Sequence, residues 1–225
     1  MGVVLSSAFY ARPTLDVARD LLGKVLVHRA RAGTVAGSIV EVEAYIGESD
    51  PACHAVTGLT RRNAPLYGPP GRAYVYLIYG IHRLVNAVTE PEGFPAAVLI
   101  RALEPRDGIA LMRRRRSRGM SGRASPLHDT DLCCGPGNLT RACGINLSQN
   151  RLDLSGGQLF IEDSDETISR VVWSPRIGIR VGIGRRWRCF AWKNPSVSGD
   201  SGLGVTTDDA PGTPLPGTRA RVRSE

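Results

Sequence analysis

The chain has 225 residues, which is the length of one domain or slightly more. Hydrophobic residues make up 42% and charged residues 22%, a balance that supports a packed core and excludes a mainly disordered chain. The net charge is +8, and 27 of the 29 cations are arginine, whose planar fork suits phosphate, although biased codon usage gives the same composition.

Hydrophobic periodicity and turn residues predict helices and strands along residues 1–198. The predicted helices are 14–22, capped by Thr14, 107–116, capped by Asp107, and a short helix that follows Gly135–Asn138 and stops at Gly144. The predicted strands are 24–28, 38–45, 73–79, 83–89, 97–103, 158–162, 177–181 and 188–192. Residues 47–70 form a long stretch without a period, and loops of that length are commonly functional.

This order of elements predicts an α+β fold. We expect a single domain with a curved, mostly antiparallel β-sheet, packed helices and a protruding β-hairpin that turns at Gly80. The predicted domain covers residues 1–198. Residues 199–225 are rich in Gly, Thr, Pro and Asp, and we expect a flexible C-terminal tail there.

A carboxylate on the strand 38–45 is a candidate site residue. Alternation along this strand predicts that Val40, Val42 and Ala44 share one face, and that Glu41, Glu43 and Tyr45 share the other. Glu43 then lies beside an aromatic ring, either in solvent or in a pocket.

Tyrosines are concentrated in one part of the chain, since five of the six fall between residues 45 and 79. Tyr74 and Tyr76 share one face of a predicted strand, and Tyr79 lies next to the turn at Gly80. Each ring is suited to ordinary sheet packing. An exposed ring at a hairpin tip is equally suited to wedging between bases or stacking on them.

Positive charge is concentrated in residues 101–150, which hold nine arginines and four acidic residues. Four of these arginines, Arg113–Arg116, end the predicted helix 107–116. Cations in a last helical turn complement the helix dipole, so the run is either a solvated helix end or a DNA-facing patch.

Cysteine and histidine spacing points away from disulfides and metals. The five cysteines and four histidines show no regular spacing, and Cys133 and Cys134 are adjacent. We expect free thiols in a reducing compartment, no metal and no cofactor. No apolar run approaches the roughly 18 residues of a membrane helix and no signal peptide is apparent, so a cytoplasmic protein that does not bind membranes is expected.

Several short stretches together resemble the alkyladenine (3-methyladenine) DNA glycosylase family in its bacterial form. The matching stretches are Leu21–Val27, Ile39–Tyr45, Gly58 through Asn63, Gly71 through Gly80, Arg101–Pro105, Gly135-Pro136 and Pro175–Gly178. They are collinear and run over residues 8–198.

The resemblance implies a monofunctional enzyme of base excision repair that flips alkylated or deaminated purines, such as 3-methyladenine, 7-methylguanine, hypoxanthine or ethenoadenine, out of double-stranded DNA. By position, Glu43 resembles the carboxylate that activates the attacking water, and Arg101 the arginine beside that water. Tyr45, His54 and Tyr76 resemble the walls around the base. Asn86 resembles the residue that crowds the amino group of guanine, and Tyr79 the residue that fills the gap in the duplex.

With this function, the positively charged side chains Arg62, Arg113, Arg114 and Arg116 are candidates for contacts with the DNA backbone. The resemblance also implies a monomer with no obligate protein partner, at the nucleoid. Lyase chemistry needs an amine, and Lys24 and Lys193, the only lysines, are both far in sequence from the tyrosines.

Two other functions are compatible with parts of the sequence. The first is a non-catalytic nucleic-acid-binding module, because the family's fold resembles the C-terminal domain of methionyl-tRNA formyltransferase; such a binder needs no buried carboxylate. The second is a small-molecule hydrolase that uses Glu41 or Glu43, which the basic band at 101–150 and the tyrosine at the hairpin tip disfavour.

Overall fold

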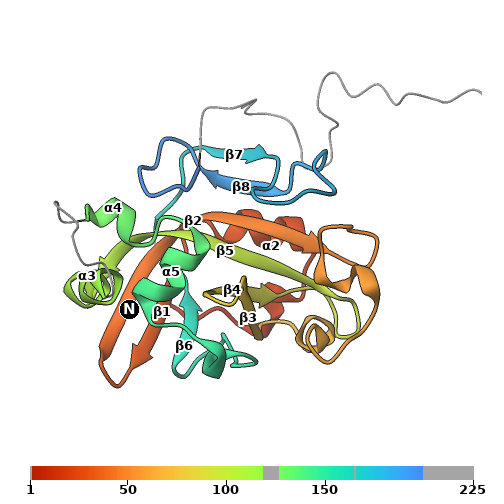
Figure 1. Ribbon diagram of the computed structural model, residues 1–225, viewed down its shortest axis with the longest axis horizontal. Coiled ribbons are helices and arrows are strands. Elements are labelled where there is room, and N and C mark those ends of the chain that lie inside the picture. Colours follow the sequence, from red (N-terminus) through yellow and green to blue (C-terminus); the bar gives the residue numbers. More distant parts are fainter. Residues whose placement is uncertain (1, 119–126, 165, 200–225) are drawn as a thin grey trace, which may run out of the picture.

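The computed structural model describes residues 2–118, 127–164 and 166–199 (Figure 1). The strands are β1 (Val25–Ala30), β2 (Gly33–Ile46), β3 (Ala73–Ile78), β4 (His82–Val88), β5 (Ala96–Asp107), β6 (Leu159–Glu162), β7 (Val171–Ser174) and β8 (Arg188–Ala191). The helices are α1 (Ser7–Tyr10), α2 (Thr14–Leu21), α3 (Ile109–Ser117), α4 (Asp129–Leu132) and α5 (Pro136–Cys143), with 3₁₀ turns η1 (His54–Thr57), η2 (Ala64–Tyr67) and η3 (Leu147–Gln149). The predicted α+β class is confirmed. Most of the predicted tail lies outside the described residues.

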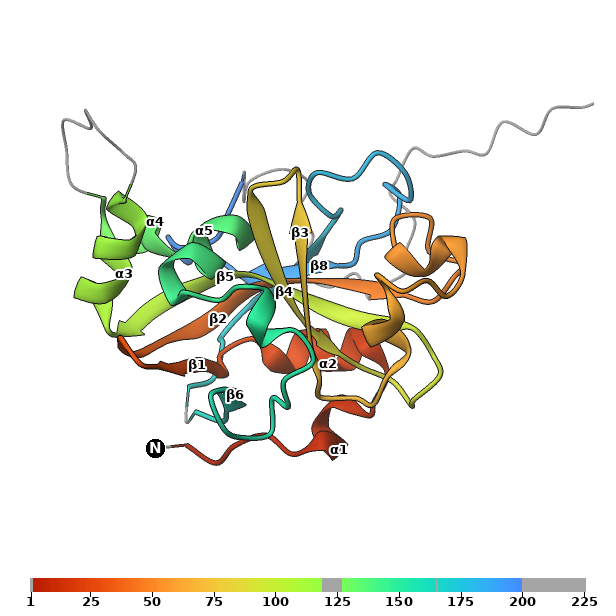
Figure 2. The same cartoon turned by 60° about the horizontal axis from the view of Figure 1, so that its bottom comes forward.

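The strands of the described residues form one curled sheet in which every pair is antiparallel. The main order is β3-β4-β5-β2-β1-β6, and β7 and β8 form a ribbon that joins it where β8 pairs with β2. The β3–β4 hairpin protrudes from the sheet, as predicted (Figure 2).

The strands alternate between a core face and a site face. On β5, Val98 and Ile100 belong to the main hydrophobic core, whereas Leu99 and Arg101 face the cavity described below. Helix α2 covers the core face with Val17, Ala18 and Leu21.

The pairing of β2 with β5 has three register shifts, and one of them disturbs this alternation. Ile39 pairs with Leu103 and Glu41 with Ala102, so Val40 is the extra residue between them. Val40 consequently packs with Phe190 in a separate cluster, away from Val42 and Ala44. The prediction that it shares their face is wrong, because a bulge shifts the pleat by one residue.

Both predicted helix caps are wrong. Pro13 precedes α2, and the carboxylate of Glu90 accepts hydrogen bonds from the N–H and the hydroxyl of Thr14, at 2.7 and 2.8 Å. The carboxylate replaces a local cap because it complements the helix dipole. Asp107 ends β5, and Gly108, with a φ of 71°, turns the chain into α3.

The predicted strand 177–181 is also wrong. The strand lies earlier, at β7, and residues 175–187 form a loop in which Gly178 and Gly182 have positive φ values. Pro175 cannot donate to a ladder hydrogen bond, which favours the end of the strand at Ser174. No helix of the described residues has the length and apolar character needed to cross a membrane.

Candidate active site

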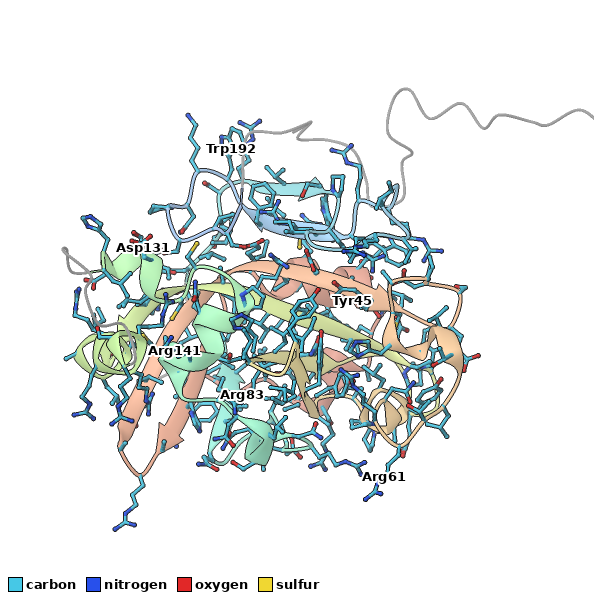
Figure 3. All side chains as sticks on the ribbon, in the orientation of Figure 1. Tyr45, Arg61, Arg83, Asp131, Arg141 and Trp192 are labelled. Atoms are coloured by element: carbon cyan, nitrogen blue, oxygen red, sulfur yellow. The ribbon has the colours of Figure 1, made fainter. Side chains whose placement is uncertain are left out.

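A cavity of about 450 Å³ opens on the site face of the sheet, between the β3–β4 hairpin, the start of α5 and the loop 175–187. Six residues assigned a role from the sequence line it: Tyr45, His54, Tyr76, Tyr79, Asn86 and Arg101. Figure 3 shows Tyr45 inside the molecule, whereas Arg61 extends from its edge. The structure therefore brings together side chains that lie up to 56 positions apart in the sequence.

Glu43 is fully buried and contacts three residues that line this cavity, Tyr45, Arg101 and Ile177. Its Oε2 accepts a hydrogen bond from the Tyr45 hydroxyl at 2.8 Å. Its Oε1 accepts the N–H of Ile177 at 2.7 Å and lies 3.2 Å from Nη1 of Arg101. A carboxylate offers about four acceptor positions, so these three contacts leave one for another donor.

Arg101 connects Glu43 to a second buried carboxylate. Its Nε donates to Glu41 at 2.8 Å, and its Nη2 donates to the Ser198 hydroxyl at 3.2 Å. Burial opposes the charge of Arg101, but Glu43 and Glu41 outweigh this effect and raise its pKa. The guanidinium therefore stays charged beside the cavity.

Three tyrosines and a histidine form an aromatic wall. The rings of Tyr74 and Tyr76 lie 5.2 Å apart, and His54 meets Tyr76 edge to face at 4.5 Å. Burial raises the pKa of Tyr74 to about 12 and raises the pKa values of Tyr45 and Tyr76 as well. All three phenols therefore keep their protons at neutral pH, and Tyr45 is the donor toward Glu43.

His54 is a neutral member of this wall. Burial, with a contribution from Arg62, lowers its pKa below the usual value. Its Nδ1 lies 2.9 Å from the Tyr74 hydroxyl. Asn63 holds the turn that carries His54, because its Nδ2 donates to the carbonyls of His54 and Gly58 at 2.9 and 2.8 Å.

Asn86 lies on β4, where it pairs with Tyr74 of this wall, and it is 4% exposed. Its Nδ2 donates to the Tyr74 carbonyl at 2.9 Å, which fixes the amide against the cavity. A fixed polar group on an otherwise aromatic wall discriminates between ring edges.

Tyr79 lies in the turn between Ile78 and His82, at the tip of the β3–β4 hairpin. It is 82% exposed and has a φ of 52°, a backbone conformation that costs a non-glycine residue energy. Ile81, in the same turn, is 66% exposed. The hairpin thus presents large apolar side chains to solvent at the mouth of the cavity.

A buried ion pair that the sequence analysis missed fixes the loop 175–187. Two nitrogens of Arg176 bind the carboxylate of Asp50 at 2.6 and 2.8 Å, and both side chains are fully buried. The guanidinium also lies over the rings of Tyr45 and Trp187, at 4.6 and 5.2 Å. This pair places Ile177 against Glu43. The stretch Pro175–Gly178 belonged to the family resemblance, but its pattern gave no signal for a partner at position 50.

The arginines expected to contact the DNA backbone have different surroundings. Arg62 is exposed, donates to the Leu77 carbonyl at 3.1 Å and lies 5.9 Å from the ring of Tyr76. Arg113 bonds Asp129, and Arg116 is buried with hydrogen bonds to the carbonyls of residues 131 and 132. Arg114 is exposed on α3. Of the four arginines, Arg62 and Arg114 are thus the two that are exposed to solvent.

An aromatic pocket whose lining includes an arginine paired with a buried carboxylate, beside an exposed aromatic hairpin tip, is typical of enzymes that act on a nucleobase turned out of a duplex. In the described part of the chain, no three His, Cys, Asp or Glu side chains gather as a metal site would require.

Comparison with known proteins agrees with this class. The family model of methylpurine-DNA glycosylase (MPG) matches residues 8–195. A relative from Methanocella arvoryzae is 47% identical over 199 residues, which cover 87% of this chain and 96% of the relative. A relative from Chlorobium phaeobacteroides is 47% identical over 197 residues, which cover 87% of this chain and 95% of the relative. Both carry the provisional name 3-methyladenine DNA glycosylase.

The chain belongs to the methylpurine-DNA glycosylase family. It is therefore a DNA glycosylase, a hydrolase of DNA repair, and the resemblance read from the sequence is confirmed.

Proposed function

We propose that this enzyme releases alkylated and deaminated purines from double-stranded DNA with a water molecule activated by Glu43. The observation that carries the proposal is the pairing of the buried Glu43 with Arg101, which lines the tyrosine-lined cavity. Water adds to the sugar C1′, its proton passes to Glu43, and the bond from C1′ to the purine nitrogen breaks with both electrons leaving on the base. The product is a free base and an abasic site.

The pocket walls suit a cationic, flat base. Tyr45, Tyr74 and Tyr76 present electron-rich rings, and a cation near such a ring gains about 0.5–2 kcal/mol. A neutral His54 adds no repulsion to a positively charged methylated purine. In this proposal, Asn86 crowds the exocyclic amino group of undamaged guanine.

Glu43 serves as the base because one acceptor position of its carboxylate is left by its three contacts. Since the side chain is fully buried, the water has to enter between Tyr45 and Arg101, which both line the cavity. The positive charge of Arg101 also stabilises the negative charge that develops on the attacking oxygen.

The hairpin tip supplies the wedge. Turning a nucleotide out of the stack costs a few kcal/mol, and an aromatic ring in the vacated space offsets part of that cost. Tyr79 is the exposed aromatic at this tip. We also propose backbone contacts from Arg62 and Arg114, which are exposed, whereas Arg113 is paired with Asp129 and Arg116 is buried.

The test is release of base from duplexes that hold 7-methylguanine, hypoxanthine or ethenoadenine, each beside an undamaged duplex. Free base and an alkali-labile abasic site are expected from at least one damaged duplex. Binding of these duplexes without release of any base would instead support the non-catalytic binding module.

A further inference from the structure

We infer that Glu41 is a positioning residue for the reaction proposed above: it holds Arg101 between two carboxylates, so that Glu43 does not carry the whole interaction with the guanidinium. The inference rests on the proposed role of Glu43. It concerns a residue two positions before Glu43 on β2, which contacts the same guanidinium as Glu43.

Glu41 is the centre of a buried hydrogen-bond network. It is fully buried, and its Oε1 accepts from Nε of Arg101 at 2.8 Å and from Nε of Arg188 at 2.7 Å. Its Oε2 accepts the N–H of Ser198 at 2.7 Å. Arg188 is also bound by the Ser174 hydroxyl and the Ser198 carbonyl, so the network joins β2, β5, β7 and β8.

Arg101 lies nearer to Glu41 than to Glu43. The Nε–Oε1 distance to Glu41 is 2.8 Å with hydrogen-bond geometry, whereas Nη1 is 3.2 Å from Oε1 of Glu43. A third nitrogen of Arg101, Nη2, donates to the hydroxyl of Ser198. The guanidinium is thus directed mainly by Glu41, and its approach to Glu43 is limited.

A further bulge between β2 and β5 places Arg101 between the two carboxylates. Ala102 pairs with Glu41 and Ile100 pairs with Val42, so Arg101 is the extra residue on β5. Bulges commonly redirect a side chain next to an active site. Here the redirected side chain lies between residues 41 and 43.

The charge of Glu41 is what matters for Glu43. Burial alone would raise the pKa of Glu41, but Arg101 and Arg188 outweigh it and hold that pKa below its ordinary value. Glu41 therefore stays negative over the working pH range. If it were neutral, the charge of Arg101 would act on Glu43 alone and make Glu43 a weaker base.

Several other ionisable groups surround Glu43, and of those named here only Arg101 and Arg188 contact Glu41. They are Tyr45 on β2, Tyr76 on β3, Arg101 on β5 and Arg176 on the loop 175–187, with Arg188 on β8 behind Glu41. A change in the pH dependence of the reaction on substitution of Glu41 is thus traced to this carboxylate.

The test compares wild type, Glu41→Gln and Glu41→Asp by base release from a hypoxanthine duplex between pH 4.5 and 8.5. For Glu41→Gln, kcat should fall about tenfold, and the acidic limb of kcat should move to lower pH by about one unit, while affinity for the duplex stays within about twofold. Glu41→Asp keeps the charge, and it should restore the position of the limb.

One result would overturn the inference: an acidic limb that stays at the wild-type pH in Glu41→Gln, whether or not the rate falls. If Glu41→Gln does not fold, the double variant Glu41→Gln/Arg188→Gln removes both buried charges of one pair, and the same displaced limb is expected. Glu43→Gln is measured alongside. Release of base by that variant would refute the proposed function itself. If Glu43→Gln releases no base and the acidic limb of kcat is unmoved in Glu41→Gln, only the role of Glu41 is refuted.

Discussion

The strained tip of the hairpin predicts that stability and activity change in opposite directions when Tyr79 is replaced by Asn. A left-handed conformation costs an ordinary residue about 1–2 kcal/mol, and Asn tolerates it better. Because Tyr79 is 82% exposed, its replacement removes only ~0.5 kcal/mol of burial, a fraction of the 1.5–3 kcal/mol of a fully buried side chain. The net gain is about 1 kcal/mol, or about 2–4 °C in Tm for a chain of this size.

The same substitution should slow the release of base. Stacking of a base on an aromatic ring contributes about 1–3 kcal/mol, so loss of the wedge should lower single-turnover release from a hypoxanthine duplex about tenfold or more. The assays are thermal unfolding and single-turnover release on the same samples. Tyr79→Phe keeps both the ring and the backbone strain, and it should match wild type in both.

The strain and the wedge are tested by separate results. A Tm for Tyr79→Asn several degrees below that of wild type would refute the strain at the tip. Release and duplex affinity equal to those of wild type would refute the wedge.

Three further outcomes are expected. Asp50→Asn leaves a buried guanidinium unpaired and should lower the free energy of unfolding by about 3–5 kcal/mol in urea titrations, whereas Asp163→Asn, at an exposed pair, should cost about 1 kcal/mol or less; equal losses would contradict the role of burial. The neutral, buried His54 stabilises the fold above its unfolded pKa of about 6.5, and this contribution is lost as pH falls through the lowered pKa of the folded state. The drop in Tm between pH 7.5 and 5 should therefore be smaller for His54→Asn than for wild type. An equal drop in both proteins would contradict the destabilisation by a protonated His54. Arg62→Ala should reduce the slope of log K against log salt for duplex binding by about 0.9. The control, Arg19→Ala, lies on the helix that covers the core face and should leave the slope unchanged. Equal slopes in the two variants would refute the proposed contact between Arg62 and a phosphate.

The parts of the fold that depend on local pattern were predictable from the sequence. Alternation along β2 placed Glu41, Glu43 and Tyr45 on one face, and the turn at Gly80 located the hairpin. These features follow from the two-residue period of a strand and from turn chemistry, which need no knowledge of distant residues.

The parts that depend on distant partners were not predictable in this way. The bulge at Val40 is set by pairing with β5, and the cap of α2 comes from Glu90, 76 positions after Thr14. Within the candidate site, the ion pair of Asp50 and Arg176 spans 126 positions, and neither residue lies in a pattern that specifies the other.

The family resemblance and the structure contributed different things to the site. The resemblance indicated the pocket residues one by one, and the structure places Tyr45, Tyr76 and Arg101 around one cavity. The hydrogen bond from the backbone of Ile177 to Glu43 was not predicted, because a loop rather than the expected strand carries it.

The most direct test of the account is single-turnover base release by Glu43→Gln, with duplex affinity measured on the same preparation. Gln has nearly the same shape and cannot take a proton from water, so the account predicts damaged-duplex binding within a few-fold of wild type and release reduced by about 10²–10⁴. Glu162→Gln, on β6, supplies the matched control and should release base at the wild-type rate. Release by Glu43→Gln at a rate near that of wild type would contradict the assignment of Glu43 as the base.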